Sequence, residues 1–68
     1  MLKLKDNVKE EDLKWYDIHY DKWHKDYRCE DFKISTKKRH ILAFNNSGYS
    51  RFDRIYRMTV DGLIEEVE

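Results

Sequence analysis

The chain has 68 residues, 41% of them charged, and its 14 lysines and arginines balance 14 aspartates and glutamates. This length excludes more than one domain, zero net charge argues against general adhesion to nucleic acid or membranes, and a single cysteine excludes an internal disulfide. Because no apolar run is long enough for a membrane span or a signal peptide, we expect an intracellular, cytoplasmic protein.

The N-terminal part predicts a short strand followed by a short helix. Leu2 and Leu4 alternate with lysines, which is the period of a strand with one buried face. Asn7 is a good N-cap residue, and Glu10 stands where a capping box needs a carboxylate. We therefore expect a helix over residues 8–16. Its inward side chains should be Val8, Leu13 and Tyr16.

The end of this helix has two readings. Large side chains with the spacing 3, 4, 3, 4 would suit one long helix over residues 8–28; they are Leu13, Tyr16, Tyr20, Trp23 and Tyr27. Alternation from Ile18 onward favours a strand instead, and Asp17 tolerates the left-handed conformation that ends a helix. We prefer a break at Asp17, a strand over residues 18–22 and a turn over residues 23–25.

The stretch from Phe32 to Phe44 predicts the hairpin on which the fold is built. Residues 36–39 are polar and should form its turn, and residues 41–44 are apolar throughout, as in a central strand covered on both sides. The preceding strand should run over residues 26–35. Its inward positions change from odd to even numbers near residues 30–31, which predicts a β-bulge there.

The C-terminal part predicts a loop over residues 45–50 and then a second helix, for which Ser50 and Asp53 resemble a capping box. Gly62 should end this helix, and residues 64–67 should form a last strand. The inward helix face should consist of Phe52, Ile55, Tyr56, Thr59 and Leu63. The expected fold class is α+β, a single domain over residues 1–68 with a small antiparallel three-stranded meander, two short helices and short terminal strands.

Three stretches resemble very small proteins carried by phages and prophages of Gram-positive bacteria. They are the opening residues 2–8, the ending residues 62–68, and the pattern of Leu13, Tyr16, Ile18 and Tyr20. Members of that group often carry Gly where Asp17 stands here, which implies a helix stop at this position. The resemblance implies an accessory gene of a mobile element, and such small genes often act by binding and inhibiting a host protein, including defence nucleases. It carries over no functional residue.

Charge is unevenly distributed along the chain. Residues 33–57 carry seven cations against one anion, whereas residues 1–32 and 58–68 are net acidic. Three cations in the hairpin turn and three arginines spaced by three on the second helix would form one basic patch if they faced the same way. The predicted patch consists of Lys37, Lys38, Arg39, Arg51, Arg54 and Arg57. It would bind phosphates or an acidic protein surface.

Two tryptophans, five tyrosines and three phenylalanines are more than so small a core can bury. Trp, Tyr and Arg are the residue types that dominate interface hot spots. Trp23, in a predicted turn, and Tyr49 are therefore the predicted aromatic anchors for a partner. A homodimer would be an equally good use of the same surface.

Candidate metal and catalytic residues are few. The possible ligands His19, His24, Cys29 and His40 lack the tight pairs of a zinc site. Cys29 with His24 or His40 would suggest a nucleophile and a base, but nothing positions a third group, and no glycine-rich phosphate loop is present. We expect no cofactor, no metal and no enzymatic activity, and we expect Cys29 to pack as a small apolar residue.

The leading hypothesis is a phage or prophage accessory protein that binds a host protein stoichiometrically and inhibits it, for example a defence nuclease. The alternatives are a small nucleic-acid-binding protein that uses residues 33–57 and a structural homodimer. No membrane partner is expected.

Overall fold

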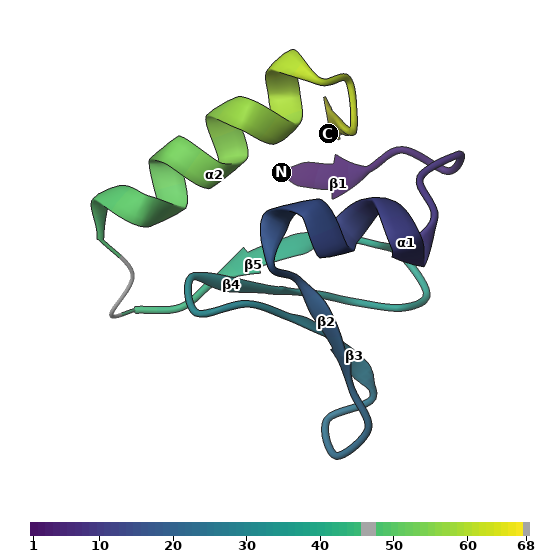
Figure 1. The fold of residues 1–68 in the computed structure, drawn as a ribbon. Helices are drawn as coiled ribbons and strands as arrows, with labels where there is room; N and C mark the ends of the chain where they lie inside the picture. Colours follow the sequence, from purple (N-terminus) through teal and green to yellow (C-terminus); the bar gives the residue numbers. More distant parts are fainter. Residues whose placement is uncertain (46–47, 68) are drawn as a thin grey trace.

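The computed structural model describes residues 1–45 and 48–67, which form two helical segments and two antiparallel sheets (Figure 1). The α+β class is confirmed. In chain order the elements are β1 (Leu2–Leu4), α1 (Glu10–Leu13), the 3-10 helix η1 (Lys14–Tyr16), β2 (His19–Asp21), β3 (Asp26–Arg28), β4 (Phe32–Ile34), β5 (Ile41–Ala43), α2 (Tyr49–Val60) and β6 (Ile64–Glu66).

The larger sheet has four strands in the order β2-β3-β4-β5, so the predicted three-stranded meander is wrong. The error lies at residues 30–31, where a two-residue turn stands in place of the predicted bulge: the N–H of Cys29 donates to the carbonyl of Phe32 at 3.1 Å. Tyr27 pairs with Ile34 across this turn, so an odd and an even position share one face. The phase change in the sequence therefore marks a chain reversal.

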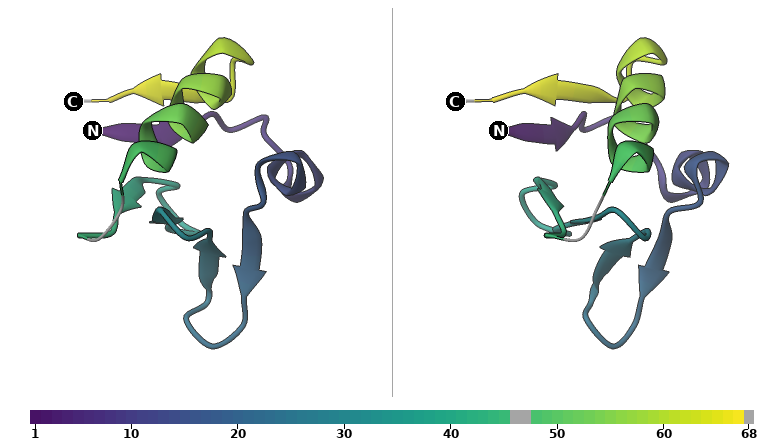
Figure 2. Two further views of the ribbon diagram at one scale, coloured as in Figure 1. Left: turned by 60° about the vertical axis from the view of Figure 1, so that its left-hand side comes forward. Right: turned by 90° about the vertical axis from the view of Figure 1, so that its left-hand side faces the viewer.

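The predicted terminal strands pair with each other in a second sheet, β1-β6. The N–H of Leu4 also donates to the carbonyl of Arg39 at 2.9 Å, and Lys3 bridges to His40, which ties β1 to the chain just before β5. The two ends of the chain consequently lie side by side (Figure 2).

The first helix ends as predicted but begins later. Asp17 has φ 60° and caps η1 in the left-handed conformation, which rules out the long helix over residues 8–28. The predicted N-cap at Asn7 is wrong, because the helix starts after Lys9, whose N–H donates to the Asp12 carboxylate at 2.9 Å. Asp12, rather than Glu10, therefore closes the first turn.

One face of the larger sheet turns toward the hydrophobic core and is buried at Phe32, Ile34 and Ile41, whereas Tyr20 in β2 is 42% exposed. Cross-strand pairing places Tyr20, Tyr27, Ile34 and Ile41 in one row on this inner face. The predicted inward residues of the first helix are buried, as the core consists of Leu4, Val8, Leu13, Tyr16, Ile18, Phe32, Ile34, Ile41, Met58 and Ile64. The prediction that residues 41–44 are covered on both sides is wrong: β5 is an edge strand of its sheet, and Leu42 and Ala43 are exposed.

The second helix is rotated relative to the prediction. Its N-cap is Gly48 rather than Ser50, and its buried residues are Arg54 and Met58. Phe52 and Tyr56, which were expected to face inward, are 61% and 68% exposed. Gly62 follows the helix with φ 81°, as expected for a C-terminal stop. The predicted loop over residues 45–50 falls partly on residues 46–47, which lie outside the described residues.

The β2–β3 hairpin projects from the rest of the molecule, as Figure 2 shows from two sides. In the portion of the chain described by the structure, no helix has the length and apolar character that a membrane crossing needs.

Candidate functional site

The six cations of the predicted basic patch do not gather on one surface. Lys37 and Lys38 are exposed in the β4–β5 turn. Arg39 in the same turn donates to the carbonyl of Val8 at 2.6 Å, so it holds the N-terminal segment. Arg51, Arg54 and Arg57 lie on α2, where they have three different environments.

Arg54 is buried, with 8% of its surface exposed, and its guanidinium forms an ion pair with the carboxylate of Asp31. Asp31 is also buried and accepts a hydrogen bond from the hydroxyl of Ser50 at 2.7 Å. These contacts tie α2 to the β3–β4 turn. Arg54 is therefore a structural residue, unavailable to any external partner, and Ser50 binds this carboxylate instead of capping the helix.

The other two arginines of α2 are less buried than Arg54. Arg57 lies 3.7 Å from Asp53, one helical turn earlier, and its side chain is 54% exposed. The guanidinium of Arg51 lies 4.5 Å from the centre of the Phe52 ring, in a cation–π arrangement. Phosphate or partner binding by these arginines stays a prediction.

The outward side of α2 carries an apolar stripe. Phe52, Tyr56 and Val60 follow each other at intervals of four residues and are 61%, 68% and 65% exposed. Tyr49, a predicted partner residue, is 92% exposed at the first position of the helix. A helix of a small domain normally buries such a stripe, but the orientation of α2 leaves these side chains exposed.

Trp15 extends this stripe onto η1. Its side chain is 85% exposed, and with Tyr56 and Val60 it lines a shallow hollow of about 470 Å³. Residues from two segments 41 positions apart in the chain therefore contribute to one surface. We call the surface formed by Trp15, Phe52, Tyr56 and Val60 the aromatic face.

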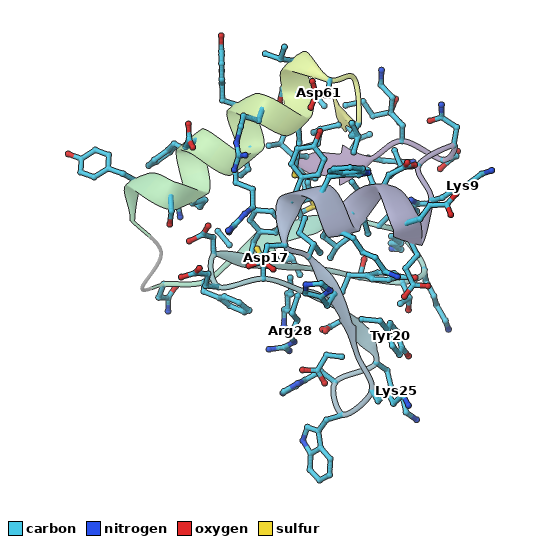
Figure 3. All side chains as sticks on the ribbon, viewed as in Figure 1. Lys9, Asp17, Tyr20, Lys25, Arg28 and Asp61 are labelled. Atoms are coloured by element: carbon cyan, nitrogen blue, oxygen red, sulfur yellow. The ribbon has the colours of Figure 1, made fainter. Side chains whose placement is uncertain are left out.

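A hydrogen bond beneath the aromatic face joins its two segments. The hydroxyl of Tyr16 in η1 donates to the carboxylate of Asp61. Figure 3 shows Asp61 at the C-terminal end of α2. Burial of the ring, together with this hydrogen bond to a negatively charged carboxylate, raises the pKa of Tyr16 from 10.0 to about 12. The hydrogen bond thus links η1, which carries Trp15, to the C-terminal end of α2.

The tip of the β2–β3 hairpin presents Trp23, which is 88% exposed. The Asp21 carboxylate accepts the backbone N–H groups of Trp23 and His24 at 2.8 and 3.0 Å, an Asx-type arrangement that orders the turn. The hydrogen bond from the His24 backbone, followed by that from the His24 ring, lowers the pKa of Asp21 below 3.8. Trp23 thus lies in the predicted turn and is exposed; binding of a partner by it stays a prediction.

The candidate ligands and nucleophile lie apart from one another. Over residues 1–45 and 48–67, no three His, Cys, Asp or Glu side chains come close enough to hold a metal ion. Cys29 packs against the hydrophobic core, and its Sγ lies 3.6 Å from the carbonyl oxygen of Phe32.

Trp15 was not among the predicted partner residues. Trp15 directly precedes Tyr16 in η1, and neighbouring residues of a helix point in different directions, so Tyr16 is buried while Trp15 is exposed. One signal was available: Trp15 does not fit the spacing of Leu13, Tyr16 and Tyr20, which indicates the outward side of the helix.

Comparisons of the chain with family models, with curated proteins and with solved structures find no match.

Proposed function

We propose that this protein acts by stoichiometric binding to a partner protein through the aromatic face. The partner is a host protein, for example a defence nuclease, and the protein is an accessory factor of a phage or prophage that inhibits it. The resemblance to small phage proteins supports the phage context, and the exposed side chains support the mode of action. On this proposal the protein is a binding module and not an enzyme.

The exposure of large apolar side chains on one surface carries the proposal. Burying a large apolar side chain contributes about 1.5–3 kcal/mol, and a domain of 68 residues has few such contributions to spare. Trp15, Tyr56 and Val60 are nevertheless exposed together. Selection for folding alone would favour polar residues there, whereas selection for binding explains an apolar surface.

The chemistry of the aromatic face fits a protein surface. Trp, Tyr and Arg are enriched in interface hot spots because they combine a large apolar area with a polar group. Here Arg57 and Asp61 line the same hollow as Trp15 and Tyr56, so charged groups of both signs border the apolar centre. This arrangement of an apolar centre and a polar rim is typical of protein–protein interfaces.

Affinity purification from a lysate of the bacterial host tests the proposal. The wild-type chain should retain one host protein, identified by mass spectrometry, and that protein after separate purification should bind in a 1:1 ratio by calorimetry. Trp15→Ala and Tyr56→Ala should each weaken this binding by at least tenfold, because each removes an anchor worth about 1.4 kcal/mol or more. Trp23→Ala is the matched control, since Trp23 is equally exposed but lies in the distant hairpin.

Three results would count against the proposal. Binding that Trp23→Ala abolishes and Trp15→Ala leaves intact would move the interface to the hairpin. Retention of no host protein would remove the partner. Sedimentation at twice the chain mass, reversed by Tyr56→Ala, would show that a second copy covers the aromatic face, which is the homodimer alternative.

A further inference from the structure

We propose that the outer face of the four-stranded sheet binds single-stranded nucleic acid, with lysines contacting the phosphates and Trp23 stacking on a base. This activity goes beyond the proposed protein binding and uses different residues. It also differs from the nucleic-acid surface expected from the sequence, because the arginines of α2 take no part in it.

The register of the strands defines this face. His19, Arg28, Lys33 and Leu42 are successive cross-strand partners, so they form a row across all four strands. The row lies opposite the buried one, and Figure 3 shows Arg28 and Tyr20 on opposite sides of the β2–β3 hairpin. A hollow of about 350 Å³ lies beside Lys33 and Leu42, between the β2–β3 turn and the β4–β5 turn. We call it the lysine groove.

The lysine groove carries an excess of positive charge. Lys25 from one turn, Lys33 from β4 and Lys37 from the other turn line it, and no carboxylate among the described residues lies within ion-pair distance of these three ammonium groups. Asp26 also lines the groove, but Arg28 neutralises it through contacts of 2.8 and 3.3 Å. Three unpaired cations in a hollow of a chain with zero net charge indicate an anionic ligand.

The type of cation favours phosphate over carboxylate. Carboxylates are recognised best by the planar, bidentate fork of arginine, whereas lysine binds phosphate as a point charge without strict geometry. The guanidinium on this face, Arg28, is already occupied by Asp26 and lies 5.5 Å from the ring centre of Phe44. The cations that remain available in the groove are lysines. The carboxylates of an acidic protein surface would therefore be attracted by the charge of the lysines but would have no available bidentate guanidinium to bind.

The apolar groups beside the groove favour a single strand over a duplex or a free anion. Leu42 lines the groove and is 39% exposed, and Trp23 is 88% exposed two positions before Lys25. The Asp21 carboxylate orders the backbone that carries Trp23, so little conformational entropy is lost when a base stacks on the indole. Unpaired bases stack on such aromatic platforms, while the paired bases of a duplex have no free face.

Fluorescence anisotropy with a labelled oligothymidylate of about 12 nucleotides tests the inference. The chain of residues 1–68 should bind it in about 50 mM NaCl. Three phosphate contacts on a single strand predict a slope of about −2 for the logarithm of the binding constant against the logarithm of the salt concentration. Raising the salt to about 200 mM should then weaken binding by roughly 15-fold. The fluorescence of Trp23 should fall on binding because the indole stacks on a base. Comparison with Trp23→Phe, in which only Trp15 fluoresces, shows that the change comes from Trp23.

Matched variants locate the site. Lys33→Glu/Lys37→Glu should weaken binding at least tenfold and flatten the salt slope. Lys9→Glu/Lys14→Glu changes the net charge equally on the exposed side of the first helix and should leave at least half of the affinity. Trp23→Ala should weaken binding at least fivefold, whereas Trp23→Phe, which keeps a stacking ring, should lose less. Trp15→Ala should have no effect on oligonucleotide binding. A negative result for the lysine groove therefore says nothing about protein binding by the aromatic face, and the reverse also holds.

The inference is overturned by any of three outcomes. One is the absence of an anisotropy change at high micromolar protein in low salt. Another is equal weakening by the two charge-reversal pairs, since the attraction would then be diffuse. The third is displacement of the oligonucleotide by poly-glutamate at equal charge concentration, which would identify the lysine groove as a site for an acidic protein. Circular dichroism melting of each variant confirms that it is folded.

Discussion

Among single residues, Asp31 and Arg54 have the largest influence on the architecture. Asp31 lies in the tight turn between β3 and β4, only 3% exposed, and a buried carboxylate is tolerated only when it is paired and hydrogen-bonded. Arg54 provides the countercharge, while its own Nε has no partner among the described groups. The buried carboxylate of Asp31 needs a countercharge, which explains why α2 buries Arg54 and leaves Phe52 exposed.

Replacing one member of this ion pair should lower the free energy of unfolding far more than replacing both. We expect Arg54→Met to lower the free energy of unfolding by about 3–5 kcal/mol, because Asp31 would remain buried without a countercharge. A domain of this size has roughly 3–10 kcal/mol in total, so much of the population would unfold. Arg54→Met/Asp31→Asn should recover a substantial part of the loss. Urea denaturation followed by circular dichroism measures all three chains, and additive losses would contradict this account.

Between elements, the contact of η1 with the end of α2 determines whether the aromatic face exists. The two segments meet through the hydroxyl of Tyr16 and the carboxylate of Asp61. Each element by itself would present only part of the surface, with Trp15 on one and Tyr56 on the other. The aromatic face is therefore a property of the packing of elements, and the ionisation of Tyr16 should control it.

Alkaline pH should disrupt this contact over a defined range. The folded chain holds the Tyr16 proton up to about pH 12, whereas the unfolded chain loses it near pH 10. The stabilisation is thus fully present below pH 10 and is lost as the pH rises from 10 to about 12. Denaturation at several pH values should show a steeper loss for the wild type than for Tyr16→Phe, which keeps the ring but has no proton to lose. Parallel curves would show that Tyr16 does not contribute.

In the whole molecule, the two ends of the chain close the fold. β1 and β6 pair with each other, Leu4 and Ile64 both enter the core, and the N-terminal ammonium lies 3.1 Å from Oε1 of Glu66. β6 follows α2 after the turn at Gly62, and the N–H of Lys5, just after β1, donates to the carbonyl of Leu63 at 2.9 Å. The position of α2, and with it the aromatic face, thus depends on strands at both termini.

Replacing a buried side chain of β6 by alanine should therefore destabilise the entire domain. Ile64 is 6% exposed, and Ile64→Ala should lower the free energy of unfolding by about 2–4 kcal/mol. Val60→Ala, at a position 65% exposed, is the control and should stay within about 0.5 kcal/mol of the wild type. Thermal melting followed by circular dichroism gives both values. Hydrogen exchange that rises only in β1 and β6, with the larger sheet still protected, would contradict a single cooperative unit.

The exposed Trp23, the basic patch and the lysine groove were predictable from the sequence to different degrees. The turn position and exposure of Trp23 followed from local signals, because a hairpin tip has no neighbours to bury it. The basic patch did not follow, since charges that share a stretch of sequence were separated by a helix rotation and by the burial of Arg54. The lysine groove combines Lys25, Lys33 and Lys37 from three segments, and only the strand register places them together.

The sequence by itself determined the elements whose signals are local. Alternation predicted the strands near Leu2 and Phe32. The conformational tolerance of Asp17 and Gly62 predicted the two helix ends, because backbone preferences act within a few residues. Tertiary structure alone decided which face of α2 is buried and how many strands residues 26–35 form. Both depend on contacts between residues that are not adjacent in the chain. The ion pair with Asp31 places Arg54 on the buried side of α2, and the pairing of Tyr27 with Ile34 defines the two-residue turn after Cys29.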